Sequence, residues 1–145
     1  MIFVLAILQQ LVFPQGVDVS TYPKIYRCEI QTLSQVYDAD TITKPDCHLG
    51  MGVKVRIRPG LRVYGINAPE VRGDGKEWGQ ACRDKLRAAI KENEMSFEFM
   101  AVTNSKGIER KGKYGRPLGH LFINGENMAL SLVGTSCAEL VDYDK

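Results

Sequence analysis

A single amphipathic helical segment stands among short strand-like segments, and this arrangement limits the folds open to the chain. Over residues 77–93, apolar side chains recur at i, i+3, i+4 and i+8, a spacing that places them on one face of a helix. These side chains are Trp78, Ala81, Cys82, Leu86, Ala89 and Ile90. We therefore predict an α-helix over 77–93, with Trp78 as a core anchor at its start and Cys82 as a small buried thiol.

The segments on both sides of this helix have the patterns of strands. Residues 53–58 alternate between apolar and basic side chains, which is typical of a half-buried strand whose basic side faces water or a ligand. A strand with a bend in its middle is predicted over 24–37. Further strands are predicted over 41–43, 61–66, 95–102 and 117–123. Residues 45–52 contain a proline and two glycines and are predicted as a loop or the end of a hairpin, and residues 104–115 are predicted as a long exposed loop. A short helix is predicted over 127–133.

About five strands with two inserted helices favour an α+β, mainly β fold: a small OB-type five-stranded antiparallel barrel with flanking helices. The chain has 145 residues, of which 44% are hydrophobic and 25% charged, and this composition is that of one globular domain with its own core. We expect that domain over residues 21–145. We expect residues 1–20 to form an apolar leader or a packed extension.

The apolar run over residues 2–8 is far too short to span a bilayer. It leaves two interpretations open, a secretory signal peptide or a segment packed on the domain, because no Lys or Arg precedes it and no clear cleavage site follows. The protein is secreted in the first case and cytoplasmic in the second.

The four cysteines are Cys28, Cys47, Cys82 and Cys137, and no pair has the C-x-x-C spacing of a zinc site. A disulfide among the three cysteines other than Cys82 stays an open possibility.

The formal net charge of +2 is too small to indicate a nucleic-acid partner, but the distribution of the charges is informative. Five basic residues lie between 106 and 116, and a second basic run contains Lys54, Arg56, Arg58 and Arg62. Either basic run, taken alone, is also typical of a face that is exposed to solvent.

Three short motifs carry residue types that together indicate phosphodiester chemistry. They are Asp38-x-Asp40-Thr41, Arg62-(x)4-Asn67-Ala68-Pro69-Glu70 and Lys113-Tyr114-Gly115-Arg116. Carboxylates suit a hard cation, two arginines suit a phosphate, and a glutamate suits water activation. Taken separately, the aspartates are also typical of turns, Glu70 of a solvated loop, and Arg62 of an ion pair in a barrel.

In this order and spacing, over about residues 30–138, the motifs resemble the staphylococcal (micrococcal) nuclease family. The resemblance implies an OB-type barrel and a calcium-dependent nuclease that acts on DNA and RNA with little sequence preference. It implies calcium ligands at Asp40, Asn67 and the backbone carbonyl of Ala68, phosphate binding at Arg62 and Arg116, a general base at Glu70, and contacts to the nucleotide at Lys113 and Tyr114. We expect Asp38 to hold waters bound to the metal.

The chain departs from the family's pattern at Asn67, where the family normally has an aspartate. Asparagine keeps a carbonyl oxygen but loses a negative charge, so we expect calcium binding to be weaker by about 10-fold. This loss supports an alternative function, a nuclease-like barrel that binds single-stranded nucleic acid without cleaving it. The joint presence of Asp40, Arg62, Glu70 and Arg116 favours the enzyme. A monomer without a membrane span is the default expectation.

Overall fold

A computed structural model of the chain describes residues 24–142. The apolar leader over residues 1–20 lies outside these residues, so the division of the chain into a leader and a domain stays a prediction. In the described part, no helix is long and apolar enough to cross a membrane.

Within residues 24–142 the chain forms short strands, two α-helices and two 3-10 turns. The strands are β1 (Lys24–Glu29), β2 (Val36–Asp38), β3 (Thr41–Thr43), β4 (Asp46–Gly50), β5 (Val53–Arg56), β6 (Gly60–Val63), β7 (Ile66–Asn67), β8 (Ser96–Ala101), β9 (Leu118–Ile123), β10 (Glu126–Asn127) and β11 (Glu139–Leu140). The helices are α2 (Lys76–Glu92) and α3 (Met128–Gly134), and the 3-10 turns are η2 (Leu33–Gln35) and η3 (Lys113–Gly115). The predicted α+β, mainly β class is confirmed.

The main sheet follows the order β2-β3-β6-β9-β8-β1-β4-β5, with β10 paired to β9. The path is open within the described residues, and β6 and β9 are parallel, with Arg62 opposite Leu118. The sheet departs from the expected five-stranded antiparallel barrel in this parallel pair and in its open path. A parallel pair needs a long crossover connection, and α2 and β8 lie in the sequence between β6 and β9.

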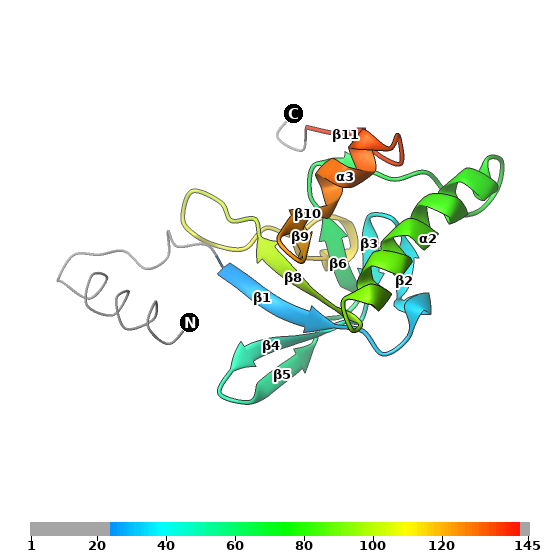
Figure 1. Ribbon diagram of the computed structural model, residues 1–145. Coiled ribbons are helices and arrows are strands. Elements are labelled where there is room, and N and C mark those ends of the chain that lie inside the picture. The colour runs from blue at the N-terminus through cyan, green and yellow to red at the C-terminus, as the bar shows by residue number, and fades with distance from the viewer. Residues whose placement is uncertain (1–23, 143–145) are drawn as a thin grey trace.

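Both helices pack their apolar faces on this sheet. Helix α2 lies along β2 and β3 on one side of the molecule (Figure 1), and its residues Cys82, Leu86 and Ile90 are fully buried. Asn127 caps α3, because its side-chain oxygen accepts a hydrogen bond of 2.9 Å from the Ala129 N–H. The prediction that Trp78 is a core anchor is wrong: its side chain is 47% exposed, because it lies in the first turn of α2, beyond the part of the helix that the sheet covers.

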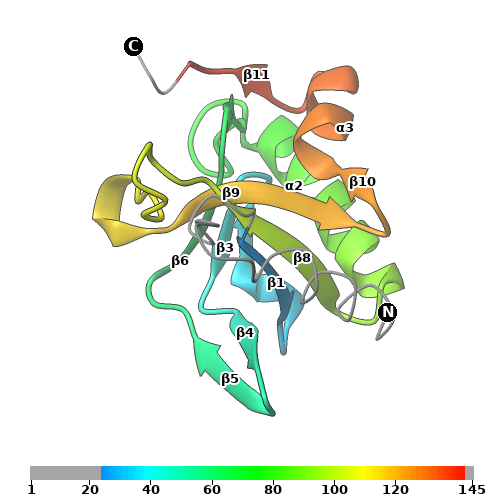
Figure 2. The same ribbon diagram turned by 90° about the vertical axis from the view of Figure 1, so that its left-hand side faces the viewer.

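Of the two interpretations of residues 45–52, the structure contradicts a loop and agrees with a hairpin end, because strand β4 occupies Asp46–Gly50 and pairs with β5. Cys47 pairs with Cys28 of β1 on one side and with Val55 of β5 on the other. Only the tip around Met51 is a turn, and the β4–β5 hairpin extends away from the rest of the fold (Figure 2). The predicted strand over 24–37 is likewise interrupted, by η2, whose Gln35 side chain accepts hydrogen bonds from two preceding backbone N–H groups.

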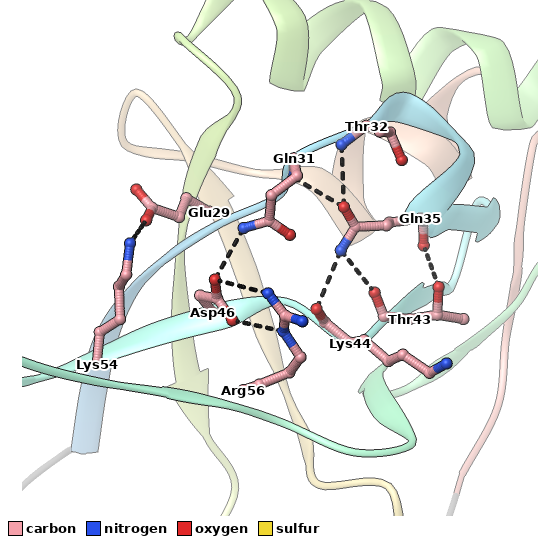
Figure 3. A network of polar contacts seen from close by, with 9 residues as sticks. All are labelled: Glu29, Gln31, Thr32, Gln35, Thr43, Lys44, Asp46, Lys54 and Arg56. Atoms are coloured by element: carbon pink, nitrogen blue, oxygen red, sulfur yellow. Dashed lines mark hydrogen bonds and ion pairs between the residues drawn. The ribbon is translucent and has the colours of Figure 1, made fainter.

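The basic side of residues 53–58 is only partly available to a ligand, because two of its charges are paired with carboxylates (Figure 3). Lys54 Nζ lies 2.8 Å from Glu29 Oε1. Arg56 Nε lies 3.0 Å from Oδ1 of Asp46, whose Oδ2 accepts a hydrogen bond of 2.8 Å from Gln31. This network ties β5 to β4 and to the end of β1, so it stabilises the sheet.

Two disulfides join segments that are distant in the sequence, Cys28–Cys47 and Cys82–Cys137. The prediction that Cys82 is a buried thiol is therefore wrong, although the residue is buried as expected. Both partners of the second bond have no exposed surface.

Candidate active site

Asp40 lies at the turn between β2 and β3, and it is the buried carboxylate around which the site is built. The residue is 6% exposed, and both carboxylate oxygens accept hydrogen bonds. Oδ1 accepts one of 2.9 Å from the Thr41 hydroxyl, and Oδ2 accepts one of 2.7 Å from the Ala68 N–H. These bonds replace the water lost on burial and fix the direction of the carboxylate.

Arg62 connects Asp40 to Asn67. The residue is on β6, opposite Thr41 of β3 in the antiparallel register, so its side chain starts next to Asp40. Its Nη1 lies 2.7 Å from Asp40 Oδ2, and its Nη2 donates to Asn67 Oδ1 at 2.7 Å. The side chain of Arg62 is 12% exposed, so one guanidinium, in a mostly buried position, holds two of the predicted calcium ligands.

Asp38 precedes this centre on β2, where its Oδ1 accepts a hydrogen bond of 3.1 Å from the Asp40 N–H. Burial, together with the nearby Asp40 carboxylate, raises the pKa of Asp38 to about 7. Asp38 therefore carries only part of a negative charge near neutral pH.

Arg116 follows the 3-10 turn η3 and reaches the same centre from the other side. Its Nη1 donates to the Thr41 hydroxyl at 3.0 Å, and that hydroxyl donates to Asp40. Its guanidinium carbon lies 5.6 Å from the centre of the Tyr114 ring, within the range of a cation–π contact. Tyr114 is 81% exposed, so its ring is available to a ligand. Thr41 is a site residue to which the sequence motif alone assigned no role.

A cleft of about 450 Å³, the cationic cleft, lies against the two arginines. It is lined by Arg62, Asn67, Arg110, Lys111, Gly112, Lys113, Arg116 and Leu118. Five of these residues are basic and none is acidic, which is the pattern that a chain of phosphates requires. Arg110 and Lys111 were not among the predicted site residues, although the basic run over 106–116 contained the signal for them.

Glu70 lies in an adjoining cleft of about 370 Å³. The lining residues are Asn67, Ala68, Pro69, Glu70, Trp78, Ser136, Ala138 and Glu139. Asn67 lines both clefts, so it marks their boundary. Helix α2 packs closely on this loop: a Cβ at Gly79 would lie 1.9 Å from the Glu70 carbonyl oxygen, so only glycine fits there.

The predicted calcium ligands have suitable chemistry, since Asp40, Asn67 and the Ala68 carbonyl offer only oxygen atoms, which calcium prefers. Among residues 24–142 no three His, Cys, Asp or Glu residues come together as a metal-binding group. Asp40, which is buried, is the one carboxylate of the predicted ligand set. The Asp40 and Asn67 oxygens that would bind a cation accept from Arg62. The residues therefore fit a hard cation, provided that Arg62 moves from both of them.

A comparison with protein families gives a match over the second part of the chain. A family model described as staphylococcal nuclease homologue matches residues 60–145, a range that contains Arg62, Asn67, Glu70 and Arg116. Asp38 and Asp40 precede the match. A search of curated proteins finds no match to this chain.

Proposed function

Because the chain belongs to the staphylococcal nuclease homologue family, we propose that it is a calcium-dependent nuclease that hydrolyses phosphodiester bonds of DNA and RNA with little sequence preference. The observation that carries the proposal is the convergence of Arg62 and Arg116 on one cleft without carboxylates, with Glu70 in the adjoining cleft. This arrangement supplies separate places for the phosphate and for the group that activates water.

The two arginines bind the scissile phosphate in this proposal. A guanidinium donates two parallel hydrogen bonds to phosphate oxygens, and negative charge on these oxygens grows toward the transition state. Arg62 has to leave Asp40 and Asn67 to reach the phosphate. Arg116 is held by the Thr41 hydroxyl, so its guanidinium is oriented before substrate binds. Such orientation lowers the cost of reorganisation during the reaction.

Glu70 holds the attacking water and accepts its proton. The carboxylate is exposed in its cleft, so water reaches it, and the tight packing of Gly79 on its backbone limits the movement of the loop. Glu70 needs only to keep the water in line with the phosphorus atom and to take up one proton.

Calcium is the cofactor that we propose for Asp40, Asn67 and the carbonyl of Ala68, where it would polarise the phosphoryl group and neutralise its charge. Asp38, next to Asp40, would hold waters of the cation's shell. Lys113, which lines the cationic cleft, and its exposed neighbour in the sequence, Tyr114, would contact the rest of the nucleotide.

A second function is supported by one specific observation, the pairing of Arg62 with Asp40 and Asn67. If this pairing persists when nucleic acid binds, calcium cannot use these oxygens, and the cationic cleft binds single strands without cleaving them. The two functions differ in their products and share their dependence on salt.

The two disulfides also support a cellular location. Disulfides persist in oxidising compartments and are rare in the cytosol, so we propose that the protein is secreted. Mass spectrometry of the protein from its native source, alkylated before and after reduction, tests this. Free thiols at all four cysteines would contradict secretion.

The experiment that separates enzyme from binding module uses the full chain with labelled single-stranded DNA and RNA. Calcium is titrated in, and a parallel series contains chelator. We expect products only in calcium. Salt-sensitive binding without product at any calcium or manganese concentration would overturn the nuclease and establish the binding module.

A further inference from the structure

The Cys82–Cys137 disulfide joins helix α2 to the segment that leads into β11, across 55 residues of sequence. We propose that this disulfide is a positioning element of the active site, which holds the loop of Asn67, Ala68 and Glu70 between α2 and β11. The inference rests on the proposed function for its catalytic consequence, but the structural part can be measured independently.

Strand β11 forms one wall of the loop. It pairs with β7 in a two-stranded sheet, with Glu139 opposite Asn67 and Leu140 opposite Ile66. The Val141 N–H donates to the Gly65 carbonyl at 2.8 Å and extends this pairing by one bond. The Asn67 side chain accepts a hydrogen bond from Arg62. Because β11 pairs with Asn67, the position of β11 affects the position of Arg62 in the cleft.

Helix α2 forms the other wall. The backbone of Gly79 lies against the Glu70 carbonyl, and the Gln80 side chain donates to the Val71 carbonyl at 3.2 Å. Cys82 is less than one turn beyond Gly79, on the buried side of the same helix. The segment that carries Glu70 is thus fastened to α2 close to the disulfide.

The disulfide joins these two walls at a point where β11 has little else to hold it. Both residues of β11 are exposed, and a two-residue strand contributes few backbone hydrogen bonds. Cys137 is two residues before Glu139, and its N–H donates to the Leu132 carbonyl at 2.7 Å at the end of α3. The bond from Cys137 to Cys82 therefore fixes where the chain leaves α3 and enters β11.

The test compares three variants with the wild-type chain. Cys82→Ala/Cys137→Ala removes the disulfide. Val141→Pro removes the N–H that donates to Gly65 just after β11, and it leaves the disulfide intact. Cys28→Ala/Cys47→Ala is the matched control, because it removes the other disulfide, which lies between β1 and β4. Val141→Pro also keeps the proposal testable where the Cys82 and Cys137 variant does not fold.

The first readout is hydrogen exchange at the Ala68 amide, which donates to Asp40, measured relative to the core amide of Leu121. We expect exchange at Ala68 to rise by about 10-fold in the first two variants and to follow global stability in the control. The second readout is cleavage, where we expect kcat to fall by about 10-fold with little change in KM. Unchanged relative exchange at Ala68 in the folded variants would overturn the positioning role.

The two readouts keep the proposals apart. A wild-type chain without cleavage under any metal contradicts the nuclease, while the exchange measurement still decides whether the disulfide positions the loop. Faster exchange at Ala68 with wild-type kcat would overturn the catalytic part of the inference.

Discussion

The guanidinium of Arg62 lies 2.7 Å from the carboxylate of Asp40, and both side chains are largely buried. The family's pattern assigns Arg62 to phosphate and Asp40 to calcium, yet here the two neutralise each other. A buried carboxylate needs a compensating positive charge, and Arg62 supplies it. Calcium and Arg62 therefore compete for Asp40, and a phosphate that draws Arg62 away favours the cation.

The variant Asn67→Asp should bind calcium more tightly, by about 10-fold, because it adds a carboxylate next to Asp40. Calcium binding to the nucleic-acid-free protein is measured by titration calorimetry. Asn124→Asp, at an exposed turn away from both clefts, is the control. Equal calcium affinity in the Asn67→Asp variant and the wild type would exclude Asn67 from the metal site.

Replacement of Arg116 by lysine should lower kcat by about 100-fold, although the charge is kept, because an ammonium cannot make the two parallel hydrogen bonds of a guanidinium. Steady-state cleavage of a labelled oligonucleotide measures this. Arg58→Lys, on an exposed residue outside the clefts, should cleave like the wild type. Wild-type turnover in Arg116→Lys would remove Arg116 from the chemical step.

Binding of single-stranded DNA in chelator should weaken with salt, because basic side chains release counterions from the phosphates. Each of Lys111 and Lys113 that contacts a phosphate should contribute about 0.7 to the slope of log K against log salt concentration. Replacing both lysines with alanine should flatten this slope, and the control Lys91→Ala, on an exposed face of α2, should not. A slope that is the same in all three proteins would place the DNA elsewhere.

Stability should depend on pH through Asp46. The Arg56 guanidinium holds the pKa of Asp46 below its usual range, so the pair stabilises the fold fully above the ordinary aspartate pKa of 3.8. This contribution disappears as the pH falls through the lowered pKa of the folded protein. The variant Asp46→Asn should therefore be less stable than the wild type at pH 7, and the difference should shrink below pH 3.8.

Urea unfolding at a series of pH values measures this effect. Asp74→Asn, on an exposed residue, is the control. A stability difference between wild type and Asp46→Asn that stays constant down to pH 2 would show that the ion pair with Arg56 is not its cause.

The sequence predicted best what depends on neighbouring residues. Helix α2 begins and ends within one residue of its predicted bounds, because its apolar face repeats regularly over four turns. Arg62 and Asn67 come from one short motif, and their contact follows from the return of the chain between β6 and β7. The Asp40 turn was also visible, since Asp favours such positions.

What the sequence did not predict depends on segments that meet only in the folded chain. Cys82 and Cys137 lie on α2 and after α3, and no spacing rule connects them. The sequence does not separate a loop from a hairpin end over residues 45–52, because Pro45 and Gly52 indicate turns and the pairing of β4 with β1 and β5 depends on distant residues. Trp78 has the helical spacing of a core residue, but the sheet does not reach the first turn of α2.

The most direct measurement of the central claim is the single-turnover rate of oligonucleotide cleavage in calcium by the wild type, Glu70→Gln and Glu77→Gln. Glu77 is an exposed carboxylate in the first turn of α2 and is not part of either cleft, so it is the matched control. We predict a rate about 10²–10⁴-fold lower for Glu70→Gln, with unchanged urea unfolding, and no change for Glu77→Gln. Cleavage by Glu70→Gln at the wild-type rate would contradict the proposed role of Glu70 and the mechanism built on it.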